Sequence, residues 1–107
     1  MMDSYLENLL NLIKSKKNDD TSVSYTAKLH SKGINEILKK IGEESSETII
    51  AAKGDSNDEL IHEIADLWFH CLVLLSVKNL RVEDVIKELK NREGVSGIEE
   101  KNNRKLK

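Results

Sequence analysis

Two stretches decide the fold: residues 34–53 read INEILKKIGEESSETIIAAK, and residues 56–79 read SNDELIHEIADLWFHCLVLLSVKN. In the first stretch, apolar residues repeat at the spacing of one helix face, and the following Gly54 is typical of a helix end. The second stretch opens with Ser56 and Glu59 at the spacing of a capping box. Because the turn between them is short, the two segments are predicted to form an antiparallel pair of long helices.

The sequence on either side predicts smaller elements. Residues 4–17 carry leucines at helical spacing, with Ser4 and Glu7 in the pattern of a second capping box. Residues 24–33 are poorly periodic and predict a loop with one or two helical turns. A short last helix is expected to begin at Val82 and to end near Gly94.

The composition favours helices over sheets. The 107 residues include no proline, one Trp, two Tyr and one Phe, and 34% of them are charged against 38% hydrophobic. We therefore predict an all-α fold in which residues 1–94 form one domain, a small helical bundle around the two long helices, and residues 95–107 form a polar tail.

Charge and cysteine content exclude several classes of protein. A net charge of −2 removes the broad attraction of nucleic-acid binders, so no nucleic-acid partner is expected. The single cysteine, Cys71, allows no disulfide within the chain and favours a cytoplasmic location. Residues 67–75 are the most apolar stretch, and they are too short for a membrane span of about 20 residues. We expect a cytoplasmic protein that does not bind membranes.

Two features predict a second copy of the chain. Ile50 lies nearly opposite the apolar face of its helix, and residues 64–77 are apolar almost all the way round. A helix of that kind is expected to be enclosed by other elements. One short bundle has too little surface to cover both regions, so homodimerisation is predicted to complete it.

Two pairs of carboxylates are predicted to meet between the long helices. Glu44 and Glu47 are spaced i, i+3 on the first helix, and Glu63 and Asp66 have the same spacing on the second. At about 1.5 Å of rise per residue, both pairs lie roughly 9 to 15 Å from the connecting turn. Facing acids at one level could supply the oxygen-rich shell that Mg²⁺ or Mn²⁺ prefers. The four residues Glu44, Glu47, Glu63 and Asp66 are the predicted metal ligands.

The polar line on the second helix also includes Glu59 and His70. Buried carboxylates cost several kcal/mol unless a cation or hydrogen bonds compensate them. The simpler alternative is that these acids are solvated surface pairs, with Glu43 bonded to Lys39 or Lys40. His70 itself is predicted to be a hydrogen-bonded core histidine, and packing alone is expected to explain Trp68, Phe69 and Cys71.

The same acids carry a family resemblance. Residues 42–47, GEESSE, with residues 63–66, EIAD, resemble the E-E-x-x-E and E-x-x-D pattern of the all-α nucleoside triphosphate pyrophosphatases, which include MazG-type enzymes and dimeric dUTPases. Residues 24–29, SYTAKL, followed by SKG at 31–33, closely resemble the phosphoribosyl-ATP pyrophosphatase branch of histidine biosynthesis. The resemblance covers about residues 4–92. His30 departs from it, because an aromatic or apolar residue is expected there.

The resemblance implies Mg²⁺-dependent hydrolysis of phosphoribosyl-ATP to phosphoribosyl-AMP and pyrophosphate by a helical homodimer. The implied catalytic residues are five acids: Glu43, Glu44, Glu47, Glu63 and Asp66. Glu43 points away from the apolar face of its helix, so it is either a base for the attacking water, a group behind the metal ligands, or a surface salt bridge.

Basic and hydroxyl side chains near the site are expected to bind the substrate. Four lysines could contact phosphates, although each taken alone is more simply explained as a solvated surface lysine: Lys28, Lys32, Lys40 and Lys53. The resemblance adds three hydroxyl donors to phosphate or ribose: Ser24, Tyr25 and Thr26.

Two other functions remain open at this point. A housekeeping pyrophosphatase acting on dUTP or aberrant nucleotides would share the acids without needing residues 24–29. A non-enzymatic helical interaction module would need no metal, so neutralising Glu44 or Asp66 would then stabilise the fold.

Overall fold

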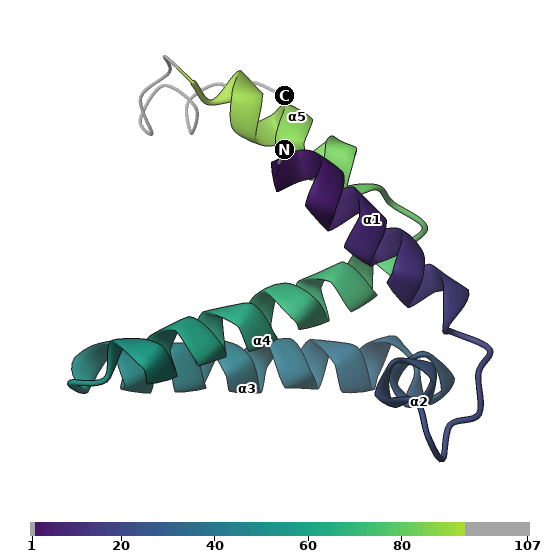
Figure 1. Cartoon of the computed structure of the whole chain (residues 1–107), viewed down its shortest axis with the longest axis horizontal. Coiled ribbons are helices and arrows are strands. Elements are labelled where there is room, and N and C mark those ends of the chain that lie inside the picture. Colours follow the sequence, from purple (N-terminus) through teal and green to yellow (C-terminus); the bar gives the residue numbers. More distant parts are fainter. Residues whose placement is uncertain (1, 94–107) are drawn as a thin grey trace.

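The computed structural model describes residues 2–93, which form five α-helices and no strand (Figure 1). This confirms the predicted all-α fold. The helices are α1 (Met2–Ser15), α2 (Tyr25–Lys32), α3 (Ile34–Lys53), α4 (Asn57–Val77) and α5 (Val82–Asn91). The predicted polar tail, residues 95–107, lies outside the described residues.

The predicted pair of long helices is confirmed. α3 and α4 run antiparallel and make the most extensive contact between helices in the described chain (Figure 1). At the start of α4, the Ser56 hydroxyl accepts a hydrogen bond from the Glu59 amide at 3.2 Å. Gly54 ends α3 with a φ of −85°, so this helix end does not use the left-handed conformation that glycine permits.

One local prediction was wrong, and another was incomplete. α1 begins at Met2, so Ser4 lies within the helix and does not cap it, and α1 ends at Ser15. Residues 25–32 form a helix of eight residues where mainly loop was expected. The Ser24 hydroxyl caps this helix by accepting from the Ala27 amide at 3.1 Å, and Leu29 is buried. A good cap and tertiary burial therefore outweigh poor periodicity.

The core lies at the end of the α3–α4 hairpin where α2 and α1 approach it. All five helices contribute to one cluster of buried apolar side chains: Leu10, Ile13, Leu29, Ile37, Leu72, Val73 and Val82. α1 and α5 leave this region side by side at an angle to the hairpin (Figure 1). The radius of gyration is 16.0 Å, whereas a compact chain of this length has about 13 Å. The single chain is therefore extended.

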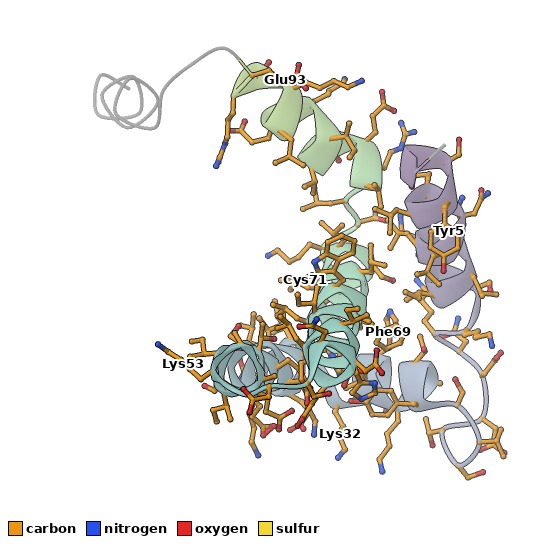
Figure 2. All side chains as sticks on the ribbon, turned by 60° about the vertical axis from the view of Figure 1, so that its left-hand side comes forward. Tyr5, Lys32, Lys53, Phe69, Cys71 and Glu93 are labelled. Atoms are coloured by element: carbon orange, nitrogen blue, oxygen red, sulfur yellow. The ribbon has the colours of Figure 1, made fainter. Side chains whose placement is uncertain are left out.

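The rest of the hairpin is poorly covered. Four large apolar side chains that lie away from the core are 52–70% exposed: Ile49, Ile50, Ile61 and Trp68. Within one chain, packing therefore does not explain Trp68, and it does not explain Cys71, which is also exposed. Figure 2 shows Phe69 and Cys71 on different sides of α4, and Phe69 packs against the core. The expectation that α4 is enclosed is not met by a single chain.

α4 is also apolar enough for another interpretation. By length and composition alone, Asn57–Val77 could cross a membrane, with a mean hydropathy of 1.6 over 18 residues. The prediction from residues 67–75 therefore underestimated the length of this apolar segment. A single helix of this kind is weak evidence for a membrane span, and the Glu63 and Asp66 carboxylates lie within it.

Candidate metal and substrate site

Three of the four predicted ligands gather between α3 and α4. Glu44 and Glu47 from α3 and Glu63 from α4 each offer one oxygen, and these oxygens lie within 4.8 Å of one another. The i, i+3 spacing places the two α3 side chains on one face, and the antiparallel packing brings Glu63 to the same level. We refer to Glu44, Glu47 and Glu63 as the acidic cluster.

The fourth predicted ligand lies beside this cluster. Asp66 forms a second group with Glu63 and His62, again with one ligand atom from each within 4.8 Å. His62 Nε2 lies 3.3 Å from the Asp66 carboxylate. Sequence reasoning gave His62 no role, although its i, i+4 spacing from Asp66 was the available signal. Glu63 is shared by both groups.

The acidic cluster lacks compensation. The Oε2 atom of Glu44 and the Oε1 atom of Glu63 are inaccessible to solvent and have no hydrogen-bond partner among the described residues. Burial raises the pKa of Glu44, and the negative charges of Glu47 and Asp66 raise it further. Burial and Glu47 likewise raise the pKa of Glu63. Buried oxygens without partners are costly, and a cation would satisfy them.

The donor set indicates which cation would fit. The acidic cluster and Asp66 offer carboxylate oxygens and no thiolate, which suits a hard divalent ion such as Mg²⁺ or Mn²⁺. The outer part of the site is open, because Glu47 is exposed. Water and phosphate oxygens could therefore complete the ligand shell.

Two other acids lie outside both groups. Glu43 is exposed and lies 3.8 Å from the Lys40 amino group, in the i, i+3 salt bridge that was one of its alternatives. Glu59 is exposed too, although it shares a line with Glu63 on α4. Neither Glu43 nor Glu59 was a predicted metal ligand, and neither belongs to a group of possible ligands.

α2 is tied to α4 next to this site. The Tyr25 hydroxyl lies 2.8 Å from His70 Nε2, and His70 Nδ1 lies 2.7 Å from the Asp66 carbonyl oxygen. His70 is 5% exposed, which confirms it as a hydrogen-bonded core histidine. The Tyr25 ring also stacks on Phe69, with the ring centroids 6.3 Å apart. The sequence did not reveal the bond between Tyr25 and His70.

The other predicted substrate residues lie at different depths. Ser24 caps α2, and Thr26 is 8% exposed. Lys28 and Lys32 are exposed on α2, whereas Lys53 is exposed at the far end of α3 (Figure 2). With α3 between them, Lys32 and Lys53 lie about 30 Å apart.

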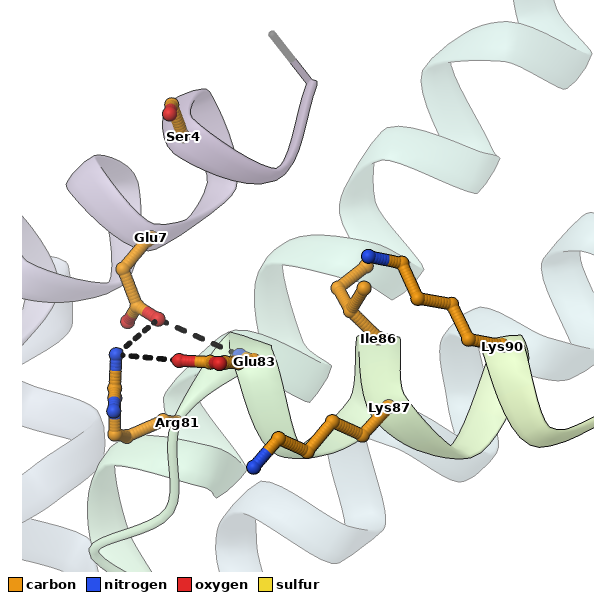
Figure 3. A pocket seen from close by; sticks show the side chains of 7 residues that line it. All are labelled: Ser4, Glu7, Arg81, Glu83, Ile86, Lys87 and Lys90. Carbon is orange, nitrogen blue, oxygen red and sulfur yellow. Dashed lines mark hydrogen bonds and ion pairs between the residues drawn. The ribbon is translucent and has the colours of Figure 1, made fainter.

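Two hollows in the described structure lie away from the acidic cluster. One of about 350 Å³ lies between α1 and α5 and contains Arg81, which is 3.7 Å from Glu7 and 2.9 Å from Glu83 (Figure 3). The other, of about 410 Å³, includes His30 and Ser76. Neither is lined by a residue of the acidic cluster.

The family model and the relatives that match this chain point to the same protein family. A family model described as phosphoribosyl-ATP pyrophosphohydrolase matches residues 6–93. A phosphoribosyl-ATP pyrophosphatase of Vesicomyosocius okutanii is 50% identical over 103 residues, which cover 96% of this chain and 98% of the relative. Proteins of the same name from Methylococcus capsulatus and Burkholderia multivorans are 48% and 52% identical, covering 94% and 91% of this chain and 96% and 84% of the relatives.

Proposed function

Because the chain belongs to the phosphoribosyl-ATP pyrophosphohydrolase family, we propose that it hydrolyses phosphoribosyl-ATP to phosphoribosyl-AMP and pyrophosphate in histidine biosynthesis. The relatives that bear this name match nearly the whole chain. The observation that carries the proposal is the pair of buried, unpartnered oxygens on Glu44 and Glu63 within the acidic cluster. Such a cluster repels a triphosphate unless divalent cations are bound as well.

The metal ligands in this proposal are Glu44, Glu47, Glu63 and Asp66, with Mg²⁺ as the natural ion and Mn²⁺ as a substitute. When bound, the metal would neutralise phosphate charge and polarise the phosphorus–oxygen bonds. His62 holds the Asp66 carboxylate from the solvent side, which fixes the orientation of that ligand. The buried oxygens of Glu44 and Glu63 are already desolvated, so binding the ion removes little further water from them.

Basic and hydroxyl side chains are proposed to bind the phosphate oxygens of the substrate that the metal does not contact. Lys28 and Lys32 on α2 and Lys40 on α3 are the proposed phosphate contacts, together with the Ser24 and Thr26 hydroxyls and Tyr25. Lys53 lies about 30 Å from Lys32, too far to contact the same phosphates. Glu43 remains a candidate base for the attacking water. Its salt bridge with Lys40 favours a different role, in which Glu43 holds that lysine at the edge of the site.

We further propose that the protein acts as a cytoplasmic homodimer. The exposed apolar side chains of α3 and α4 support this, because large exposed apolar surfaces mark interaction sites. We refer to Ile49, Ile50, Ile61 and Trp68 as the apolar patch. Ile50→Glu should give monomers or insoluble protein in sedimentation velocity. Val23→Glu is the matched control, since Val23 is 83% exposed outside this patch. An intact, active dimer of Ile50→Glu would overturn this part of the proposal.

The test of function is pyrophosphate release from phosphoribosyl-ATP, ATP and dUTP, with Mg²⁺ and with EDTA. We expect release from phosphoribosyl-ATP alone, lost in EDTA and in Glu47→Gln. Glu59→Gln is the control, because Glu59 is an exposed acid of α4 outside both groups. Cleavage of dUTP or ATP in its place would assign the protein to the housekeeping branch, and no cleavage of any substrate would refute the enzymatic proposal.

A further inference from the structure

Two histidines join α2 and α4 in the same way but in opposite directions. His70 on α4 bonds to the Asp66 carbonyl oxygen, one turn earlier, and to the Tyr25 hydroxyl on α2. His30 on α2 bonds to the Thr26 carbonyl oxygen, one turn earlier, and to the Ser76 hydroxyl on α4, at 2.8 Å in both cases. We name these contacts the Tyr25–His70 bridge and the His30–Ser76 bridge.

The geometry fixes the direction of the Tyr25–His70 bond. A carbonyl oxygen only accepts, so His70 Nδ1 carries the proton that it donates to the Asp66 carbonyl. In the neutral imidazole, Nε2 then accepts, and the Tyr25 hydroxyl donates to it. Burial also raises the pKa of Tyr25, which keeps this hydroxyl protonated. The Tyr25 proton is therefore already used within the protein.

The two bridges differ in where they meet α4. The Tyr25–His70 bridge ends on the backbone of Asp66, beside the acidic groups. Ser76 lies about 15 Å further along α4 than Asp66. Both bridges hold α2, yet only the first links it to a proposed metal ligand. The first turn of α2 lies between Ser24 and Lys28. Both of these residues are proposed substrate contacts.

We propose that His70 is a positioning residue, which fixes Tyr25 and the first turn of α2 relative to Asp66 and thereby places the substrate contacts of α2 against the metal site. This inference rests on the proposed function. It changes the role of Tyr25, whose hydroxyl orients the protein instead of donating to phosphate or ribose. Groups that bind different parts of one substrate must be held in fixed relation, because small displacements weaken binding.

Kinetics of four variants test this role at saturating Mg²⁺. Tyr25→Phe and His70→Leu each remove the bond, and each should raise KM about three- to tenfold, as expected for one lost hydrogen bond, with kcat changed less than about twofold. The double variant should raise KM no further, because both changes break one contact. His70→Gln should restore KM, since its amide oxygen can accept from Tyr25. Ser76→Ala, which breaks the other bridge, should lower the urea midpoint and leave KM unchanged.

Other outcomes overturn the inference. If Tyr25→Phe raises KM and His70→Leu does not, the Tyr25 hydroxyl contacts the substrate directly. Additive effects in the double variant, or an unchanged KM in both single variants, would refute the positioning role. An equal rise of KM in Ser76→Ala would show that KM depends only on the general stability of α2.

Imidazole ¹⁵N NMR of the metal-free protein tests the bridge without activity. We expect both His70 and His30 to carry the proton on Nδ1, and Tyr25→Phe to shift only the Nε2 signal of His70. A His70 signal that is indifferent to Tyr25→Phe would refute the bridge. An intact bridge in a wild-type protein that does not cleave phosphoribosyl-ATP would instead refute the proposed function, and with it the kinetic role of His70.

Discussion

Acidic side chains meet at two places in the described structure, and only one of these places has an arginine or lysine in salt-bridge contact. Between α1 and α5, Arg81 lies within 4 Å of both Glu7 and Glu83 (Figure 3). Between α3 and α4, the acidic cluster of Glu44, Glu47 and Glu63 has no salt-bridge partner among the described residues. In the first group the chain itself supplies an opposing charge, one guanidinium for two carboxylates, whereas no arginine or lysine of the described residues forms a salt bridge with the second group.

The difference separates structural charges from functional ones. Exposed pairs such as Arg81–Glu83 contribute about 0.2–1 kcal/mol to stability. The acidic cluster instead contains carboxylates whose pKa values are raised by burial and by one another, so the ionised form of these groups is disfavoured in the folded chain. Perturbed titratable groups that cost stability are typical of functional sites. Substituting equivalent acids in the two places tests this contrast.

The largest effect is expected on activity. Glu44→Gln and Glu63→Gln should each lower kcat/KM for pyrophosphate release by about a hundredfold or more. Loss of a residue that only hydrogen-bonds to a metal ligand lowers activity about 10–100-fold, and loss of the ligand itself should lower it further. The assay is pyrophosphate release from phosphoribosyl-ATP in excess Mg²⁺.

Glu83→Gln provides the control for this comparison. It removes one acid from the Arg81 group, far from the acidic cluster, and should leave kcat/KM within about twofold of the wild type. Equal losses in the two places would mean that the acidic cluster has no special role in the reaction.

Metal binding should give the second largest effect. Mg²⁺ at about 100 times its dissociation constant stabilises the folded state by about 2.7 kcal/mol. For a domain of this size, that raises the melting temperature by on the order of 10 °C or more. Differential scanning calorimetry should show the rise in wild type and in Glu83→Gln. A similar rise in Glu44→Gln would place the metal elsewhere on the molecule.

Without metal, substitutions in the two places should have opposite signs. In EDTA, Glu44→Gln removes like-charge repulsion worth about 0.5 kcal/mol, so the melting temperature should rise by about 2–4 °C. Glu83→Gln breaks the contact with Arg81 and should lower it slightly. Calorimetry of both variants in EDTA measures the difference. A fall in both would indicate that the acidic cluster has a compensating base in solution.

The sequence predicted the regions of the fold that local signals control. Helical periodicity and the Ser56 cap defined α3 and α4 closely. α2 was predicted only as one or two helical turns within a loop, because its stability depends on a cap at Ser24 and on burial of Leu29 by other helices, which periodicity does not report. The apolar pattern of α4 also predicted that one chain could not cover this helix, and Trp68 is 52% exposed.

The candidate site was predictable only where spacing determines contact. The i, i+3 pairs and the short turn predicted that Glu44, Glu47 and Glu63 would meet. The contacts of His70 with Tyr25 and of Arg81 with Glu7 join residues far apart in sequence, so they depend on how the helices cross. Such contacts follow from the packing of the whole core, for which a single sequence gives no local signal.

The smallest effect is expected on the pH dependence of folding stability, which should have opposite signs with and without bound metal. In the folded metal-free chain, the pKa of Glu44 and of Glu63 lies above the ordinary value of 4.5. The folded state therefore holds these protons more tightly than the unfolded state, so stability is gained as the pH falls through the folded pKa toward 4.5 and is lost as the pH rises through the folded pKa. Mg²⁺ competes with the same protons, so metal-induced stabilisation should instead weaken over this range.

The pH dependence of the metal-free protein is measured by thermal unfolding in EDTA at pH 7 and at pH 5, in wild type and in Glu44→Gln. Comparing the two proteins cancels the contributions of the histidines that they share, and the melting temperature of the wild type should rise relative to that of the variant on acidification. Glu83→Gln should follow the wild type, because it leaves the acidic cluster intact. If acidification destabilises wild type and Glu44→Gln equally, protonation of the acidic cluster does not relieve the repulsion on which the contrast between the two acidic regions depends.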